Sequence, residues 1–155
     1  MRRILSLPNV LNVVEVGHRG FTLNNKLQTK NEKLTIVTGS RIRERGFASI
    51  LDFIPASRPC YVSVDIDVLD PIYAPATSTP VPCGLSPQEL KQMLRVLGQN
   101  REVVGFDLME INPERDIGWS TTIIGCHLIL SALGAFMANR KKRLEASEKS
   151  MSQVV

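Results

Sequence analysis

The sequence predicts an α/β protein built on a parallel sheet, because strand-like and helix-like segments alternate along it. Short runs rich in β-branched residues, bounded by glycine or proline, predict strands at 12–17, 34–38, 61–68 and 103–111. Helix-like periodicity predicts helices at 41–53, at 87–97 and from about 120. Strands connected by helices are typical of parallel sheets, in which ligands bind beyond the carboxyl ends of the strands.

The composition is that of one soluble domain. The chain has 155 residues, of which 43% are hydrophobic and 22% charged, and a net charge of +4. Its basic residues are not interleaved with aromatic ones, so nucleic-acid binding is not expected. Three widely spaced cysteines predict free thiols, and Pro8 interrupts the only signal-like start, so a cytoplasmic location is expected.

Two helix starts have recognisable caps. Ser86-Pro87-Gln88-Glu89 combines an N-cap serine, a proline at the first helical position and a glutamate at the third. Leu90, Met93, Leu94 and Leu97 then form one apolar stripe, and Gly98 is expected to end the helix. Ser40 is expected to cap the helix at 41–53.

The segment 117–139 contains no charged residue and is followed by a basic cluster at 140–143. This pattern fits either a membrane span or a helix buried inside an α/β protein. Polar residues and three glycines favour the buried helix, so no membrane association is expected, and His127 is expected to lie in the core or against another helix. The residues at 140–155 are expected to form a polar, frayed tail.

Carboxylates lie at the end of the strand at 61–68. Asp65 and Asp67 are alternate residues, so a regular strand would direct both to one face of the sheet. Two adjacent carboxylates repel unless a proton or cation lies between them, and a divalent metal is a suitable partner. Solvated aspartates at a strand end are the alternative. Asp70, before Pro71, is expected to cap the following turn.

A third acidic residue, Glu110, lies at the end of the strand at 103–111. The carboxyl ends of parallel strands meet at one edge of a sheet, so Asp65, Asp67 and Glu110 are expected to converge there. This convergence predicts a site independently of any family resemblance.

The acidic strand and its surroundings resemble the ureohydrolase family of arginases, agmatinases and formimidoylglutamases. The resemblance rests on three stretches in order: 14–20, the run 63–71 with the loop at 74–86, and 105–116. It implies that residues 1–139 are the C-terminal portion of a three-layer α/β/α ureohydrolase domain. It also implies two manganese ions per complete site and a bridging hydroxide that attacks a guanidino or formimino carbon.

The resemblance assigns roles to the three acidic residues. Asp65 matches a carboxylate that bridges both metals, Asp67 one that binds a single metal, and Glu110 the acid that holds the substrate guanidinium. The loop at 76–86 is most similar to that of agmatinases, which favours agmatine as the substrate and urea as the product. Family members are usually homo-oligomers, so a homo-oligomer is expected.

The sequence departs from the family at its other metal ligands. The motifs G-G-D-H and D-A-H-x-D are absent, and the two histidines, His18 and His127, lie outside such motifs. The chain alone is therefore expected to be an incomplete and nearly inactive portion of an enzyme, with His18 a possible neighbour of the site. Two alternatives are a non-catalytic partner of full-length subunits and a phosphatase of the haloacid dehalogenase type, in which Asp65 would be the nucleophile.

Overall fold

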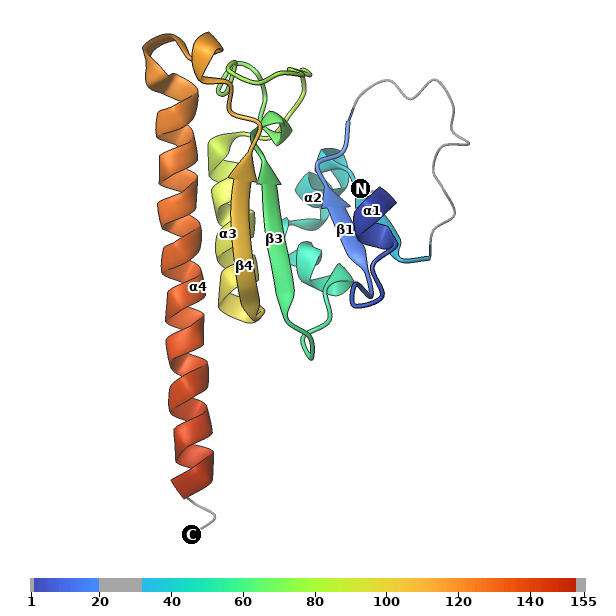
Figure 1. Ribbon diagram of the computed structural model, residues 1–155, viewed down its shortest axis with the longest axis vertical. Helices are drawn as coiled ribbons and strands as arrows, with labels where there is room; N and C mark the ends of the chain where they lie inside the picture. Colours follow the sequence, from blue (N-terminus) through green and yellow to red (C-terminus); the bar gives the residue numbers. More distant parts are fainter. Residues whose placement is uncertain (1, 20–31, 153–155) are drawn as a thin grey trace.

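The computed structural model describes residues 2–19 and 32–152. Its helices and strands alternate as the sequence predicts (Figure 1). In chain order they are α1 (Arg2–Leu5), β1 (Val13–Val16), β2 (Leu34–Val37), α2 (Gly39–Arg45), β3 (Cys60–Asp65), α3 (Pro87–Asn100), β4 (Val103–Met109) and α4 (Ser120–Ser152). Short 3-10 helices follow α2 (η2, Phe47–Phe53), β3 (η3, Ile66–Val68) and β4 (η4, Pro113–Arg115, and η5, Ile117–Trp119).

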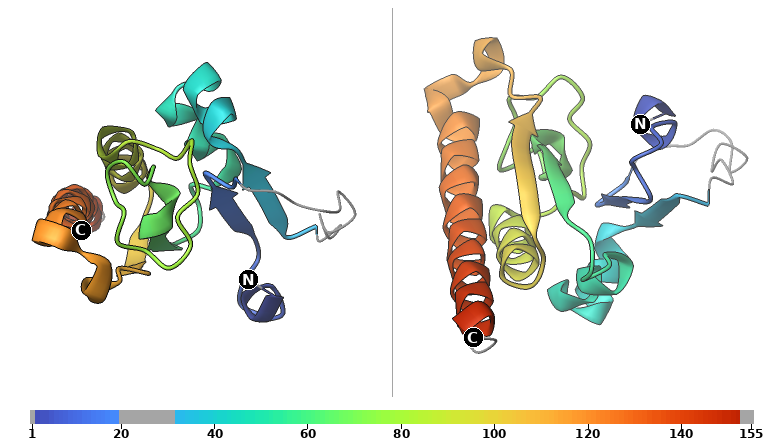
Figure 2. Two further views of the ribbon diagram at one scale, coloured as in Figure 1. Left: turned by 90° about the horizontal axis from the view of Figure 1, so that it is seen from above. Right: turned by 60° about the horizontal axis from the view of Figure 1, so that its bottom comes forward.

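All strand pairs in the described residues are parallel, as predicted. β1 pairs with β2, and β3 pairs with β4, giving two two-stranded sheets. Figures 1 and 2 show the two sheets side by side, with β1 and β3 on their facing sides. Two strands of either sheet have little core of their own, so packing against the helices stabilises this arrangement.

The core lies on one face of the sheet formed by β3 and β4. Val64 of β3 points toward α3, whose buried residues are Leu90, Met93, Leu94, Leu97 and Gly98. The predicted capping box is confirmed: Ser86 Oγ accepts from the Glu89 N–H, and the Glu89 carboxylate accepts from the Ser86 N–H. The helix continues to Asn100, beyond the end expected at Gly98. The opposite sheet face is polar, and Tyr61 and Ser63 are exposed on it.

The helix predicted at 41–53 is divided into α2 and η2 at Gly46. Gly46 has a φ of 81°, in the left-handed region that favours glycine and interrupts a right-handed helix. The N-cap is Thr38, whose hydroxyl accepts from the Arg41 N–H, and not Ser40. Threonine and serine hydroxyls both cap helices, so the sequence does not distinguish between them. The predicted helix start at 41 is therefore two residues later than the observed start at Gly39.

Helix α4 begins at Ser120, where it was predicted, but its burial differs from the prediction. The buried positions form one stripe that packs against β4 and α3, at Thr121, Gly125, Leu128 and Ala132. His127 lies off this stripe and is exposed, so the prediction of a core histidine is wrong. Residues 117–152 are long and apolar enough to cross a membrane, and 22% of the most apolar window is buried.

The frayed tail expected at 140–155 is wrong for residues 140–152, which continue α4 to Ser152. The segment is rich in lysine, arginine, glutamate and alanine, which are strong helix formers. Lys141 and Glu145 form an i,i+4 ion pair at 3.9 Å, and Arg143 Nη2 lies 2.6 Å from Glu102 Oε2. Residues 153–155 lie outside the described residues.

Candidate functional site

The candidate site lies where β3 and β4 end, and its first two members are Asp65 and Asp67. Strand β3 ends at Asp65, and Asp67 belongs to the 3-10 turn η3. The alternation predicted that the two carboxylates would share one face of a strand. This prediction is wrong, because Asp67 lies in a turn. Instead Asp65 Oδ1 accepts a hydrogen bond from the Asp67 N–H at 3.0 Å. A short aspartate side chain readily bonds the backbone two residues ahead, and this turn brings Asp67 beside Asp65.

Negative charge accumulates around Asp65. Burial raises the pKa of the Asp65 carboxyl, although the Asp67 N–H opposes the rise, and the carboxylates of Asp67 and Glu110 raise that pKa further. Both carboxylates therefore lie within electrostatic reach of Asp65, and the convergence of all three on one metal stays a prediction. A cation bound beside Asp65 would favour the ionised form of this carboxyl.

Glu110 follows the last residue of β4 and adopts a left-handed backbone, with a φ of 67°. Such a conformation is uncommon for a residue with a side chain and recurs at functional sites. The preceding residue, Met109, is the register partner of Asp65. Glu110 therefore lies just past the end of the strand next to Asp65, one residue beyond the partner of Asp65, and its side chain is exposed.

Arg19, which lies in the family-like stretch 14–20 but was assigned no role from the sequence, fixes the turn after β3. Its guanidinium donates to the backbone carbonyls of Asp67, Val68 and Leu69, with distances of 3.2 Å to Val68 and 3.1 Å to Leu69. It also donates to the Val81 carbonyl at 2.8 Å. One arginine thus connects the end of β1 with the turn carrying Asp67 and with the proline-rich loop. The sequence feature that could have identified Arg19 is its position two residues after Gly17, at the end of a predicted strand, where ligand sites of parallel sheets form.

The proline-rich loop at 71–87 forms a wall of the site and is tied down by polar contacts. The prediction that Asp70 caps it is confirmed, because Asp70 Oδ1 accepts from the Ile72 N–H at 3.0 Å and Oδ2 from the Gly84 N–H at 3.1 Å. These N–H groups lower the pKa of Asp70. Thr79 Oγ1, on the same loop, lies 3.3 Å from Asp67 Oδ2 and orients that carboxylate.

A cleft of about 670 Å³ separates the two sheets and reaches the acidic residues. β1 forms one side and β3 the other, and Asp65 and Asp67 lie at the end of the cleft. His18 also lines this cleft, and its Nδ1 lies 2.6 Å from Glu15 Oε1. The structure therefore places His18 in the same cleft as the acidic pair, where it contacts Glu15 of β1.

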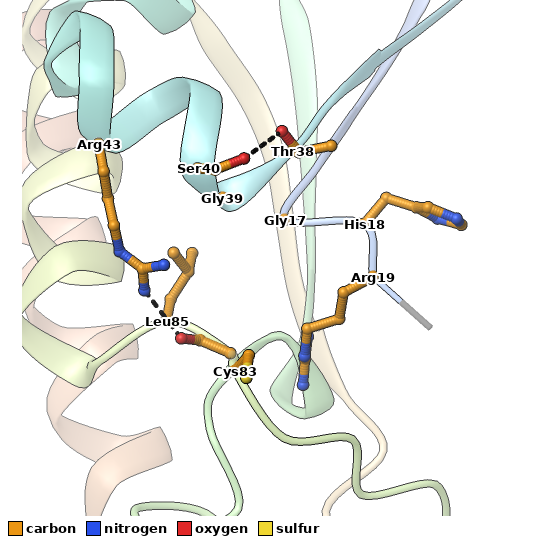
Figure 3. A pocket seen from close by; sticks show the side chains of 10 residues that line it. Gly17, His18, Arg19, Thr38, Gly39, Ser40, Arg43, Cys83 and Leu85 are labelled. Carbon is orange, nitrogen blue, oxygen red and sulfur yellow. Dashed lines mark hydrogen bonds between the residues drawn. The ribbon is translucent and has the colours of Figure 1, made fainter. Parts of the chain in front are cut away.

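A second, smaller cavity of about 240 Å³ lies between the end of β1, the start of α2 and the loop at 83–85 (Figure 3). Arg43 points into it and donates to the Gly84 carbonyl at 2.9 Å, while Thr38 and Ser40 bond to each other across its edge. Because Arg43 is also paired with Glu89 at 2.7 Å, its charge is already compensated. The Asp65 cleft is thus the stronger candidate.

The acidic pair fits part of a metal site. Carboxylate oxygens are suitable ligands for manganese, and the pKa of Asp65 is raised first by burial and then by the carboxylates of Asp67 and Glu110. In residues 2–19 and 32–152, however, no three histidine, cysteine, aspartate or glutamate side chains gather closely enough to hold a metal ion. The described residues therefore provide two candidate ligands and not a complete coordination sphere.

Comparisons with known proteins place this geometry in a family. Residues 1–134 match the arginase family. Proclavaminate amidinohydrolase of Streptomyces clavuligerus is 38% identical over 123 residues, which cover 75% of this chain and 38% of that protein. Agmatinase of Proteus mirabilis is 36% identical over 106 residues, covering 66% and 34% of the two chains.

The solved structure of the Streptomyces clavuligerus proclavaminate amidinohydrolase has the same fold over the matched region. It superposes with a TM-score of 0.71 at 36% identity and covers 81% of this chain and 42% of that one. The chain spans about two fifths of the length of these relatives, consistent with their C-terminal portion. The match sets aside the phosphatase alternative, whose nucleophile motif Asp65 and Asp67 only partly resemble. The protein belongs to the arginase family.

Proposed function

We propose that the protein takes part in manganese-dependent hydrolysis of a C–N bond in a guanidino compound, with Asp65 and Asp67 as metal ligands. The observation that supports this most strongly is the partly buried Asp65, whose pKa is raised by burial and by the carboxylates of Asp67 and Glu110. A divalent cation would neutralise this excess of charge. The names of the relatives, an amidinohydrolase and an agmatinase, support the reaction class.

The residues of this chain would divide the work of such a site. Manganese, when bound, lowers the pKa of a coordinated water and supplies a hydroxide nucleophile near neutral pH. Asp65 and Asp67 would hold metal through their carboxylates, and the Thr79 hydroxyl bonds to Asp67 and orients its side chain. Arg19 holds the backbone of the turn that carries Asp67 through its carbonyls, which limits the positions that the Asp67 carboxylate can take.

Glu110 is proposed to bind the cationic end of the substrate. A carboxylate can accept two parallel hydrogen bonds from the N–H groups of a guanidinium, which gives both charge compensation and orientation. Its exposed side chain, on the strand next to Asp65, would bring the guanidino carbon beside the metal ligands. The agmatinase-like sequence of the loop at 76–86 favours agmatine within this substrate class.

Two carboxylates do not fix a pair of metal ions, so the proposal needs further ligands from outside the described residues. The cleft of about 670 Å³ between β1 and β3 opens directly beside Asp65 and offers space for them. We therefore expect little hydrolysis by residues 1–155 alone. The reaction should be tested with a complete site.

A fusion protein provides that test. The portion of the Proteus mirabilis agmatinase that this chain does not match is joined ahead of the chain, and urea release from agmatine is measured. We expect urea release that requires manganese, is removed by a chelator and falls at least ~100-fold in Asp65→Asn. The matched control, Asp52→Asn, changes an exposed aspartate outside the cleft and should keep full activity.

Thermal unfolding of each fusion protein shows whether the variants are folded. Urea release that Asp65→Asn leaves unchanged in a folded fusion protein contradicts the ligand assignment. A folded, manganese-loaded fusion protein without urea release from agmatine, arginine or 3-guanidinopropionate contradicts the proposed reaction and favours the non-catalytic partner.

A further inference from the structure

Glu15 and His18 form a polar pair at the carboxyl end of β1, and the proposed reaction uses neither of them. His18 Nδ1 lies 2.6 Å from Glu15 Oε1, and the two side chains are 40% and 29% exposed. An ionised carboxylate only accepts hydrogen bonds, so Nδ1 donates to Glu15. Within residues 2–19 and 32–152, the second ring nitrogen, Nε2, bonds to no other group. The pair therefore presents one unused polar atom.

The pair faces the same cleft as the candidate metal ligands. Glu15 lies between two valines that pack against the core, so its side chain is on the opposite face of β1. Asp65 follows Val64 of the core and is likewise on the opposite face of β3. Figure 1 shows β1 and β3 ending at the same edge, where ligands of parallel sheets bind. The His18 ring points away from Arg43 of the smaller cavity (Figure 3).

The charges along the cleft favour a cation beside this pair. Among the described residues that line the cleft, the acidic ones are Glu15, Asp65 and Asp67, and the basic ones are His18 and Arg19. The Arg19 N–H groups already donate to backbone carbonyls. The pair has a net charge of about −1 with a neutral imidazole ring and about zero with a protonated one. In neither state is it net positive, so it attracts an ammonium group and not a carboxylate.

We propose that the Glu15–His18 pair binds an alkylammonium group at the end of the substrate that is remote from the guanidinium. The ammonium group donates to His18 Nε2, while Glu15 supplies negative charge through its hydrogen bond to Nδ1. This inference rests on the proposed function and narrows its substrates to guanidino compounds with a distal amine. An uncharged tail gains nothing from the pair, and a distal carboxylate is repelled by Glu15.

NMR titration of the metal-free 155-residue chain tests the pair without any need for hydrolysis. The probes are agmatine, butylguanidine and 4-guanidinobutyrate, which share the guanidinium and differ in the charge of the tail. Agmatine should shift the His18 ring signals and bind ~10-fold or more tightly than the other two compounds. Agmatine that leaves the His18 ring signals unchanged overturns the inference. So does tighter binding of 4-guanidinobutyrate than of butylguanidine, because it would show an anion site.

Two variants separate the pair from other sources of attraction. Glu15→Gln keeps the size of the side chain and removes its charge, and His18→Leu removes the acceptor nitrogen. Both should lose the preference for agmatine over butylguanidine, while Glu44→Gln, at an exposed position of α2, should keep it. The amide spectrum shows whether each variant is folded. A folded Glu15→Gln chain that keeps the full preference overturns the inference.

Kinetics of the fusion protein distinguish this inference from the proposed reaction. Glu15→Gln should lower kcat/KM for agmatine ~10-fold or more and leave kcat/KM for butylguanidine unchanged. Equal kcat/KM for agmatine and butylguanidine in the wild-type fusion protein overturns the role of the pair and leaves the reaction class intact. Selective binding of agmatine without urea release contradicts the reaction and supports the role of the pair.

Discussion

The ion pair between Arg43 and Glu89 should make stability depend on pH in a defined direction. Glu89 accepts from Arg43 Nε at 2.7 Å and from the Ser86 N–H at 2.7 Å, so one carboxylate connects α2 with the start of α3. The Arg43 guanidinium, followed by the Ser86 donors, lowers the pKa of Glu89 from 4.5 to about 2. Glu89→Gln keeps the size of the side chain and removes its charge.

The size of the effect follows from the pKa and from exposure. Each pKa unit corresponds to about 1.4 kcal/mol, so the lowered pKa of Glu89 sets an upper bound of roughly 3 kcal/mol. The Glu89 and Arg43 side chains are 21% and 43% exposed, so solvent screens their interaction. We therefore expect Glu89→Gln to lower the free energy of unfolding at pH 7 by about 1 kcal/mol.

The pH dependence distinguishes the ion pair from a general packing defect. The pKa of Glu89 is lower in the folded state, so its contribution is complete above pH 4.5 and is lost as the pH falls toward 2. Urea unfolding measures the difference in free energy of unfolding between wild type and Glu89→Gln. This difference at pH 3 should be less than about half of its value at pH 7. Glu44→Gln, at an exposed position of α2, is the control. An equal loss of stability at both pH values would refute the reasoning.

Three further substitutions test the packing around the site, each by urea unfolding at pH 7. Gly84→Ala places a Cβ 2.4 Å from the Asp70 backbone nitrogen, and the resulting overpacking should cost about 1–3 kcal/mol. Leu128→Ala opens a cavity at a residue that is 2% exposed and should cost about 2–5 kcal/mol, whereas exposed Ile72→Ala should stay within about 0.5 kcal/mol. Asp116→Ala removes the acceptor of the Thr121 and Thr122 N–H groups at the start of α4 and should cost about 1–2 kcal/mol. No change in Asp116→Ala would show that the cap does not stabilise the helix.

The sequence predicted most of the fold because local signals agree with the tertiary structure. Strand positions, parallel pairing and the capping box at Ser86 follow from alternation and cap chemistry, which depend on neighbouring residues. The break at Gly46 was missed, because an isolated glycine is compatible with a continuous helix. The prediction that His127 is buried was wrong, because the sequence of an uncharged helix does not show which side of the helix packs against the core.

The site was predicted in composition more accurately than in geometry. Asp65 and Glu110 were placed correctly at strand ends, since acidic residues within apolar strands are rare and stand out. The turn that carries Asp67 was read as strand, because Ile66 and Val68 favour strand as much as a short turn. Arg19 was missed because its role depends on backbone carbonyls far along the chain, which side-chain patterns do not show.

The central claim, that the end of β3 binds a divalent metal, can be tested directly on the 155-residue chain. Substoichiometric Mn²⁺ broadens the NMR signals of nearby amides, so the amides of Asp65 and Asp67 should lose intensity first. The double variant Asp65→Asn/Asp67→Asn should abolish this broadening, while Asp52→Asn should not. Broadening that starts elsewhere, or that persists in the double variant, would contradict the assignment of these two carboxylates as metal ligands.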